Sequence, residues 1–385
     1  MSGALTILVA KGQQDTVLTD NPQISFFRQN YKRHVNFSQA VLSQVIQGQP
    51  GEGATSTVKI DRKGDLLSYM YITKVVAPNE TSGSGPGPQP LICEEDIEYI
   101  ELLIGEQVID TISTKQLTAL SCFSSKYPRS TAGTYITSES SSGFNGLFCY
   151  PLGFWFCEHW QSALPLTSLQ YHDVRLRIKW GSLNTGPGGP GDPDTSYQLW
   201  CNYIYLDNDE RNYISKRGTT DTLMYQHQST IASNSLLTHL PFNNPVLFLF
   251  TELGDTDLFG TEWLGDGATV YSPTQYDSTV NLKINGVDIV DPKSLYPHYN
   301  IIPIMYHTTY GKYEPIPGKM QTDIPSFIYP FALNCSQLQP SGTCNFSRID
   351  SAYIGSKWPV TKPIYARSYN VLRIKNGMGG LLFSL

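Results

Sequence analysis

The stretch QPSGTCNFSRIDSAYI, residues 339–354, places small and turn-forming residues before an Arg/Asp pair and an apolar segment. Several of its side chains carry reactive groups, and Cys344 is the candidate for a nucleophile. A cysteine nucleophile needs a base beside it, and the motif holds no histidine. The stretch therefore predicts a tight corner that leads into a β-strand, without a catalytic role.

The same stretch belongs to a set of three segments that recur along the chain in the same order, at offsets of about 175 to 180 residues. In one pair, Pro165 stands opposite Pro340 and Val174 opposite Ile349. Because three weak matches share one order and nearly one offset, they predict two copies of a single β-domain. The matching pairs are residues 164–178 with 339–354, 101–112 with 281–292, and 148–151 with 327–330.

Composition and patterning predict an all-β chain. Charged residues make up 16% of the sequence, below the roughly 25% of an average soluble domain. In VRLRIKW, residues 174–180, apolar and basic residues alternate, as in a strand with one buried face. Residues 280–290 carry Asn285 and Gly286 between two alternating runs, which indicates a tight hairpin. Further strands are predicted at residues 56–76, on both sides of a turn at 61–65, and at 199–207.

Charge, hydropathy and cysteine usage exclude several classes of protein. The net charge is −6, whereas proteins that neutralise nucleic acid present a basic face. No apolar run reaches the about 18 residues that a membrane span needs, and the N-terminus lacks the features of a signal peptide. The seven cysteines are an odd number and are dispersed along the chain. They predict reduced, buried thiols in a cytosolic compartment.

The repeat also predicts domain boundaries. Each copy would hold about 170–190 residues, a size that fits an eight-stranded Greek-key sandwich. The charged segment at residues 208–222 predicts an exposed linker between the copies. We therefore expect an N-terminal arm at residues 1–24, a first domain at 25–212 and a second at 213–385. Loops rich in Gly and Pro are predicted above the sheets at residues 77–90, 138–146, 181–196 and 251–275.

Six segments spread from end to end resemble the major capsid proteins of nucleocytoplasmic large DNA viruses, the group that includes chloroviruses and iridoviruses. The resemblance implies a double jelly roll, with two eight-stranded antiparallel sandwiches standing perpendicular to the capsid surface. It also implies a homotrimer of pseudo-hexagonal outline that tiles an icosahedral shell. The chain looks compact for this family, and we expect a low crown of loops on its outward face. The matching segments are DNPQISFFRQNYKRHVNFS (20–38), DIEYIELLIGEQVID (96–110), ALPLTSLQYHDVRLRI (163–178), YLDNDERN (205–212), QPSGTCNFSRID (339–350) and ARSYNVLRIKNGMGGLLF (366–383).

Basic and aromatic residues interleave in FFRQNYKRH, residues 26–34. Such a pattern suits stacking on nucleic acid or contact with an acidic membrane surface. The alternative is a strand or one-turn helix that holds the N-terminal arm beneath the roll, or an interface, and the acidic chain as a whole favours these. The resemblance places the arm on the inner side of the capsid, near minor capsid proteins and the internal membrane. The candidate base contacts are therefore Arg28, Tyr31, Lys32 and Arg33.

Arg348 and Asp350 lie two residues apart, so in a strand they would share a face. They are a candidate structural pair, either across a domain or subunit boundary or within a locally satisfied corner, and the local corner is favoured. Cys149, Cys157 and His159 do not have the spacing of a zinc site, and a thiol packed among aromatic residues is the better interpretation. We predict no metal site, no cofactor and no catalytic residue.

The predicted function is structural: a viral major capsid protein whose mechanism is assembly. Its expected partners are two further copies in a homotrimer, neighbouring capsomers, minor capsid proteins and the internal viral membrane, with no direct nucleic-acid contact. Its expected location is the virion, after assembly in the host cytoplasm. The alternatives are a minor capsid or scaffolding protein of the same fold, and a jelly-roll carbohydrate-binding protein that would stack sugars on Trp263 or Tyr271.

Overall fold

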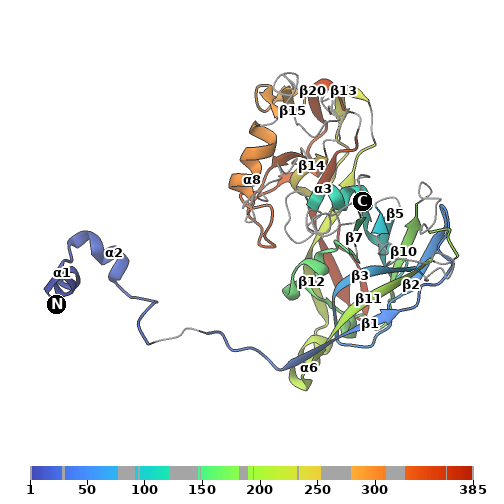
Figure 1. Cartoon of the computed structure of the whole chain (residues 1–385), viewed down its shortest axis with the longest axis horizontal. Coiled ribbons are helices and arrows are strands. Elements are labelled where there is room, and N and C mark those ends of the chain that lie inside the picture. The colour runs from blue at the N-terminus through green and yellow to red at the C-terminus, as the bar shows by residue number, and fades with distance from the viewer. Residues whose placement is uncertain are drawn as a thin grey trace, which may run out of the picture. The chain divides into compact units, whose positions relative to one another are not determined.

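The computed structural model describes most of the chain outside its predicted loops. The described residues fall into two compact units, Met1–Phe37 and Ser38–Leu385 (Figure 1). The greater part of the four predicted loops lies outside the described residues, as do Trp263 and Tyr271 and the expected crown. The structure describes residues 2–27, 31–76, 92–93, 96–121, 146–147, 149–181, 190–193, 195–231, 234–252, 279–295, 297–308, 326–360 and 362–383.

The N-terminal unit is short and solvent-exposed. It contains the helices α1 (Ser2–Val9), η1 (Gln13–Asp15) and α2 (Thr16–Thr19), with no buried residue in η1 or α2. Its large apolar side chains are exposed, for example Phe26 with an exposed fraction of 94%. Among the described residues, no helix is long and apolar enough to cross a bilayer.

The first half of the larger unit folds into two antiparallel sheets, called here the first roll. One sheet has the strand order β1-β11-β3-β8, with β9 also paired to β3, and the other has the order β2-β10-β5-β6. The strands are β1 (Phe37–Gln44), β2 (Thr55–Lys59), β3 (Leu66–Val76), β5 (Ile97–Ile104), β6 (Gln107–Ser113), β8 (Cys149–Pro151), β9 (Leu164–Pro165), β10 (Val174–Trp180) and β11 (Thr195–Leu206). A further small pair joins β4 (Ile92–Cys93) to β7 (Gly146–Leu147), and the helices are α3 (Thr114–Ser121), α5 (Trp155–Glu158), η2 (Trp160–Ser162) and η3 (Leu166–Ser168).

The second half repeats this arrangement and is called here the second roll. Its sheets have the orders β12-β21-β14-β18 and β13-β20-β15-β16, with β19 paired to β14, β22 to β21 and β17 to β15. The strands are β12 (Thr219–Ser229), β13 (Ser235–His239), β14 (Pro245–Glu252), β15 (Thr279–Ile284), β16 (Val287–Asp288), β17 (Lys293–Ser294), β18 (Ser326–Pro330), β19 (Cys344–Asn345), β20 (Ala352–Val360), β21 (Tyr365–Lys375) and β22 (Met378–Leu381). The helices are α6 (Asn208–Lys216), η4 (Pro297–Ile301), α8 (Ile302–His307) and η5 (Phe346–Arg348).

The two rolls have one topology. Replacing each strand of the first roll by its counterpart turns β1-β11-β3-β8 into β12-β21-β14-β18, and β2-β10-β5-β6 into β13-β20-β15-β16. Each set of two facing sheets with this strand order is a jelly roll. The predicted all-β class and the double jelly roll are confirmed. The boundaries expected at residues 24/25 and 212/213 stay a prediction.

One detail of the predicted repeat was wrong. Pro165 in β9 lies opposite Leu66 of β3, and Asn345 in β19 lies opposite Pro245 of β14. Pro165 therefore corresponds to Asn345, at an offset of 180, and not to Pro340. The shorter offset arose because two prolines were aligned on residue type alone, while strand pairing fixes the true register.

The predicted strands are confirmed where the structure describes them. The burial of β10 alternates at every residue, so its basic side chains lie on the outer face. Asn285 and Gly286 have φ values of 50° and 79° and form the tight turn between β15 and β16. The predicted exposed linker is instead the helix α6, none of whose residues is buried. Arg211 of α6 fixes this helix to the first roll through two hydrogen bonds, of 2.8 and 2.9 Å, to the Asp65 carboxylate.

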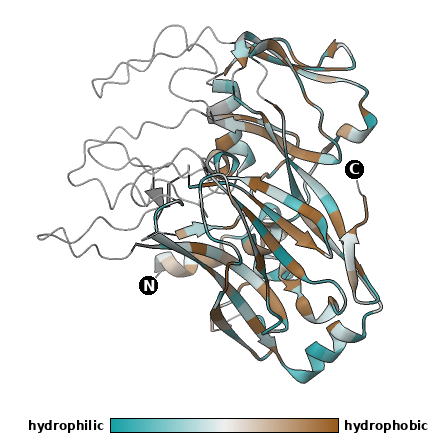
Figure 2. Cartoon of the chain, turned by 90° about the vertical axis from the view of Figure 1, so that its right-hand side faces the viewer, coloured by the Kyte–Doolittle hydropathy of each residue, from teal (hydrophilic) through white to brown (hydrophobic). Residues whose placement is uncertain are grey.

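Two apolar clusters hold the larger unit together. Apolar and polar residues alternate along several strands, as in β10 (Figure 2). In β14, in contrast, consecutive apolar residues from Val246 to Phe250 are buried on both faces of the sheet. One cluster lies within the second roll around Leu249, Leu282 and Phe346. The other cluster fills the first roll and continues through Tyr225 and Phe248 of the second roll. The rolls therefore share apolar core as well as a chain connection.

Candidate functional site

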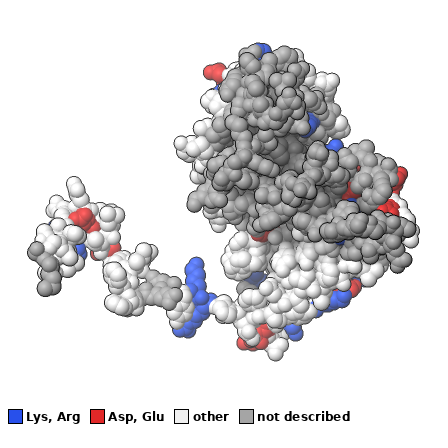
Figure 3. All heavy atoms as spheres, viewed as in Figure 1, with Lys and Arg blue, Asp and Glu red and all other residues white. Residues whose placement is uncertain are grey.

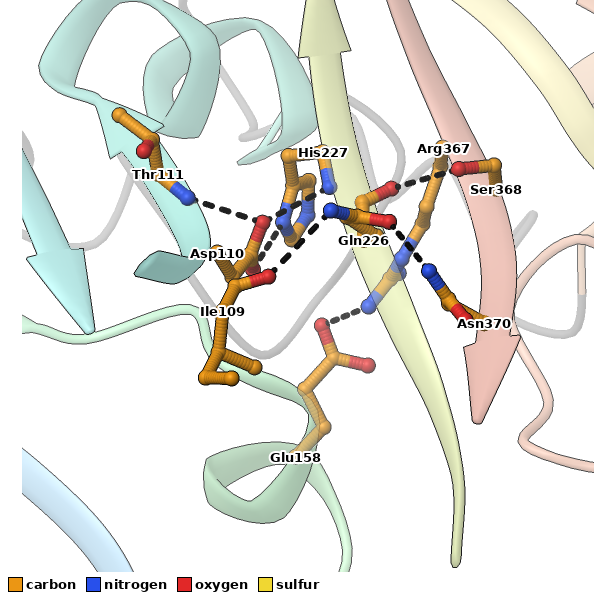
Figure 4. A network of polar contacts seen from close by, with 9 residues as sticks. All are labelled: Ile109, Asp110, Thr111, Glu158, Gln226, His227, Arg367, Ser368 and Asn370. Carbon is orange, nitrogen blue, oxygen red and sulfur yellow. Dashed lines mark hydrogen bonds and ion pairs between the residues drawn. The ribbon is translucent and has the colours of Figure 1, made fainter. Parts of the chain in front are cut away.

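Buried polar residues join the two rolls at a surface called here the seam, where β6, α3 and α5 of the first roll meet β12, β14 and β21 of the second (Figure 4). Asp110 of β6 accepts hydrogen bonds from the backbone N–H of His227 and from its Nδ1, each at 2.9 Å. The side chains of Asp110 and His227 are 0% and 1% exposed. Because a carboxylate only accepts, Nδ1 carries the proton and Nε2 has no partner among the described residues.

A second buried pair lies beside the first. Glu158 of α5 forms an ion pair with Arg367 of β21, and their side chains are only 15% and 5% exposed. The Arg367 guanidinium also lies over the ring of Tyr225, with its carbon 3.9 Å from the ring centroid. Such a cation–π contact strengthens when water is excluded. Burial raises the pKa of the Tyr225 hydroxyl well above its ordinary value, so this residue stays neutral.

Amide side chains connect these pairs. Gln226 of β12 donates from Nε2 to the carbonyl oxygen of Ile109 at 3.3 Å and accepts at Oε1 from Asn370 Nδ2 at 2.9 Å. Asn370 lies on β21, so one network spans β6, β12 and β21 (Figure 4). A buried polar network of this kind favours one relative orientation of the groups that it joins. These contacts therefore hold β6 and α5 of the first roll against β12 and β21 of the second.

A cleft of about 750 Å³ opens next to the network. It is lined by Arg217 at the end of α6, by Asp221 of β12, by Leu338 and by the Glu158–Arg367 pair. Burial raises the pKa of the Cys335 thiol in its wall to about 12, so this thiol stays protonated and is a poor nucleophile. Gln339 and Pro340, the start of the sequence motif that suggested a corner, form part of the wall.

The C-terminal hairpin makes a second contact between the rolls. After β21 the chain turns at Asn376 and Gly377, both with positive φ, and returns as β22. The carbonyl oxygen of Gly379 lies 2.9 Å from His172 Nδ1 in the first roll. A Cβ atom on Gly379 would lie 2.7 Å from Leu169, so the absence of a side chain permits this close approach.

Three of the four predicted base contacts are described by the structure, and Arg28 is outside the described residues. Tyr31, Lys32 and Arg33 are exposed and belong to neither a helix nor a strand, so the expected strand or one-turn helix is wrong for residues 31–33. Lys and Arg side chains gather there, just before β1 (Figure 3). The contacts of these residues in a capsid stay a prediction.

Arg348 and Asp350 do not share a strand. Arg348 ends the helix η5, whereas Asp350 lies in the bend before β20, and both side chains are exposed. Within the described residues they form no ion pair with each other. The corner is held instead by Asn285, whose Oδ1 accepts from the backbone N–H groups of Asp350 and Ser351, each at 3.1 Å. A partner for Arg348 or Asp350 in another subunit stays a prediction.

The cysteine and histidine residues do not gather around a common point. Cys157 lies in α5, not in a strand, and burial raises the pKa of its thiol. His159 Nδ1 accepts a hydrogen bond from the backbone N–H of Gln161 at 3.1 Å. In the described part of the chain, no group of His, Cys, Asp and Glu could hold a metal ion. The cysteines whose side chains are described, Cys149, Cys157, Cys201, Cys335 and Cys344, are free thiols.

The sequence did not identify the seam. Asp110, Glu158 and Arg367 lie far apart in the chain, and only folding brings them near His227. The available signal was weak. Asp110 stands between Ile109 and Thr111 in the repeated segment 101–112, where a charged side chain among apolar residues is unusual. Nothing in the pattern indicated which residue would pair with it.

Comparison with known proteins gives consistent results. Residues 25–207 match a family model described as the N-terminus of major capsid proteins. Over the full length of both chains, the sequence is 34% identical to the major capsid protein of Pyramimonas orientalis virus and 28% identical to that of Paramecium bursaria Chlorella virus 1. The PBCV-1 capsid structure superposes with a TM-score of 0.72 at 26% identity, covering 94% of this chain and 100% of the other. The Faustovirus major capsid protein has the same fold, with a TM-score of 0.61 at 13% identity over 97% and 96% of the two chains.

Proposed function

Because this chain belongs to the family of viral major capsid proteins, we propose that three copies associate into a trimeric capsomer of pseudo-hexagonal outline. Three chains with two similar rolls each supply six similar blocks around a threefold axis, and six blocks pack as a hexagon. The observation that carries this proposal is the identical strand order of the two rolls. The buried seam supports it, because rolls that are fixed against each other can act as one rigid tile.

The proposed role is assembly rather than catalysis. Capsomers would contact neighbouring capsomers in the shell of the virion, after assembly in the host cytoplasm. The arm at residues 1–24 and the exposed Tyr31, Lys32 and Arg33 would contact minor capsid proteins or the internal membrane on the inner side. Exposed apolar and basic side chains in this unit support that part of the proposal.

Light scattering after size-exclusion chromatography tests the trimer. We expect the purified full-length chain at micromolar concentration to have three times the mass of one chain. Obligate assemblies bury several thousand Å² and do not dissociate at this concentration. A monomer under mild buffer conditions would contradict the proposal. Electron micrographs of the same sample should show particles of hexagonal outline.

A further inference from the structure

Within the chain, the first roll covers an aromatic sheet face of the second roll. Helix α3, which directly follows β6, packs against β14. The β14 side chains Phe248 and Phe250 are 1% and 0% exposed and belong to the apolar cluster that fills the first roll. Their ring centroids lie 5.4 Å apart. In this contact, α3 of the first roll covers the outer face of the β14 sheet in the second roll.

The first roll carries the equivalent aromatic face. β9 and β19 pair with β3 and β14 in the same way, so Leu66 corresponds to Pro245. Counting along the strands from there, Tyr69 corresponds to Phe248 and Tyr71 to Phe250. The centroids of the two tyrosine rings lie 6.5 Å apart, and Tyr69 is 41% exposed. The first roll therefore has an uncovered copy of the face that α3 covers on the second roll.

Among the described residues, the uncovered face carries no Asp, Glu, Lys or Arg side chain. Tyr71 lies opposite Trp200 of β11, whose Nε1 donates to Thr73 at 2.9 Å on the same face. Asn202 Nδ2 donates to Gln39 Oε1 of β1 at 3.3 Å, which extends the face to the edge of the sheet. Enrichment in aromatic side chains and depletion of charge are typical of the buried centre of protein interfaces. A sheet face exposed to solvent would ordinarily carry charged residues, as β10 does.

The second roll carries the element that matches α3. In the first roll Ser113 pairs with Tyr99, and α3 begins at the next residue. In the second roll Ser294 pairs with the corresponding Thr279, and η4 and α8 follow. On α8, Ile302, Met305 and Tyr306 are 41%, 60% and 72% exposed. Their spacing of three and four residues places them on one side of the helix.

We propose that α8 of one copy packs onto Tyr69, Tyr71 and Trp200 of the next copy, and so repeats between chains the contact that α3 makes within the chain. This inference rests on the proposed trimer, which supplies the next copy. Within one chain Tyr69 and the α8 side chains are exposed, and Tyr71 and Trp200 are half-buried, so the chain does not fully cover either surface itself. A head-to-tail contact of this kind closes into a ring when three copies meet around an axis. The described residues of both surfaces include no Asp, Glu, Lys or Arg, so none of these side chains is desolvated when the surfaces meet.

Charge substitutions test the contact. We expect Met305→Asp alone and Tyr69→Arg alone each to weaken trimer association about 30-fold or more, the effect of losing an interface hot spot. The double variant places opposite charges at the contact and should recover part of the trimer. The matched control is Tyr213→Asp on α6, which changes an exposed tyrosine elsewhere and should stay trimeric. Mass by light scattering across a dilution series gives the readout.

A disulfide test does not depend on weakening the assembly. Cys149 is exposed and pairs in register with Thr73 on the same sheet face, so the parent protein should carry Cys149→Ser. In that parent, Tyr69→Cys with Met305→Cys should form covalent trimers on a non-reducing gel after mild oxidation. The control pair Tyr69→Cys with Tyr213→Cys should give no more covalent trimer than the parent.

The outcomes distinguish failure of the trimer proposal from failure of the α8 contact. A wild-type protein that is monomeric in the dilution series would overturn the trimer and this inference with it. A wild-type trimer that survives both single substitutions, or that gives no covalent trimer with the cysteine pair, would overturn only the α8 contact. If a charged variant fails to fold, the yield of covalent trimer from the cysteine pair alone decides whether α8 makes this contact.

Discussion

At the scale of single residues, Asp110 is the side chain on which the seam most depends. It accepts hydrogen bonds from the His227 backbone and imidazole and from the backbone N–H of Thr111. Buried donors that lose an acceptor bear the full cost of their desolvation. The Asp110 carboxylate therefore accepts three hydrogen bonds, one from the first roll and two from the second.

Replacing Asp110 by Ala should lower the free energy of unfolding by about 3 kcal/mol, because it leaves two His227 donors unpaired inside the protein. Asp110→Asn should cost less, since its amide oxygen can still accept. Urea unfolding followed by tryptophan fluorescence measures both. The matched control is the exposed Asp61→Ala, which should change stability by less than about 0.5 kcal/mol. Equal losses for the Asp110→Ala and Asp61→Ala variants would refute this role of the network.

The surface carboxylate of Asp173 should make the stability of the fold depend on pH. Lys59 Nζ donates to Asp173 Oδ2 at 2.8 Å, and this hydrogen bond lowers the pKa of Asp173 from its ordinary value of 3.8. Because the pKa of Asp173 is lower in the folded than in the unfolded state, its ionised carboxylate stabilises the fold at pH values above the unfolded pKa. This stability is lost as the pH falls through the pKa of the folded state.

The melting temperature of Asp173→Asn should therefore lie below that of the wild type at pH 6, and the difference should shrink as the pH falls below about 4. Differential scanning calorimetry between pH 2 and pH 7 gives both curves, with Asp61→Asn as the control on the same surface. A difference that grows on acidification would show that the sign of this linkage is wrong.

At the scale of elements, local patterns predicted strands and turns well. Two of these patterns are confirmed: the alternation in residues 174–180 and the turn at Asn285 and Gly286. Both depend on backbone conformations that a few neighbouring residues determine. The offset of the repeat was displaced, because strand pairing and not residue identity fixes register. The helix α6 was missed, because a charged segment without apolar periodicity resembles a linker. Contacts between distant elements, such as the seam, depend on tertiary packing that no local pattern encodes.

The C-terminal hairpin is a test of element packing. Gly379→Ala would place a methyl group 2.7 Å from Leu169 and 3.1 Å from Ile104, so β22 must shift. We expect a loss of about 1–3 kcal/mol in the free energy of unfolding, typical of overpacking. Gly218→Ala is the matched control, because nothing lies within 4 Å of its added atom and its φ is ordinary. Hydrogen exchange of the β22 amides should quicken in the first variant only, and unchanged exchange there would argue against the close contact.

At the scale of the whole molecule, the chain consists of a rigid double roll and an exposed N-terminal unit. Apolar core and buried polar groups both cross between the rolls. The N-terminal helices bury nothing of this kind. Stability and assembly should therefore depend on different parts of the chain.

Deleting residues 2–24 should leave the melting temperature within about 1 °C of the wild type, because these residues contribute no buried apolar surface. The same deletion should reduce the incorporation of capsomers into shells, if the arm holds partners on the inner side. Calorimetry and a co-expression assembly assay separate the two effects. A fall of several degrees would mean that the arm packs on the rolls.

The place of β21 in its sheet has a consequence for synthesis. This strand lies between β12 and β14, although both precede it in the chain by more than a hundred residues. During synthesis, β12 and β14 therefore leave the ribosome before the strand that joins them, and the sheet stays divided in two until β21 emerges. The second roll can close only after that point, so the edges of β12 and β14 remain unpaired in the meantime.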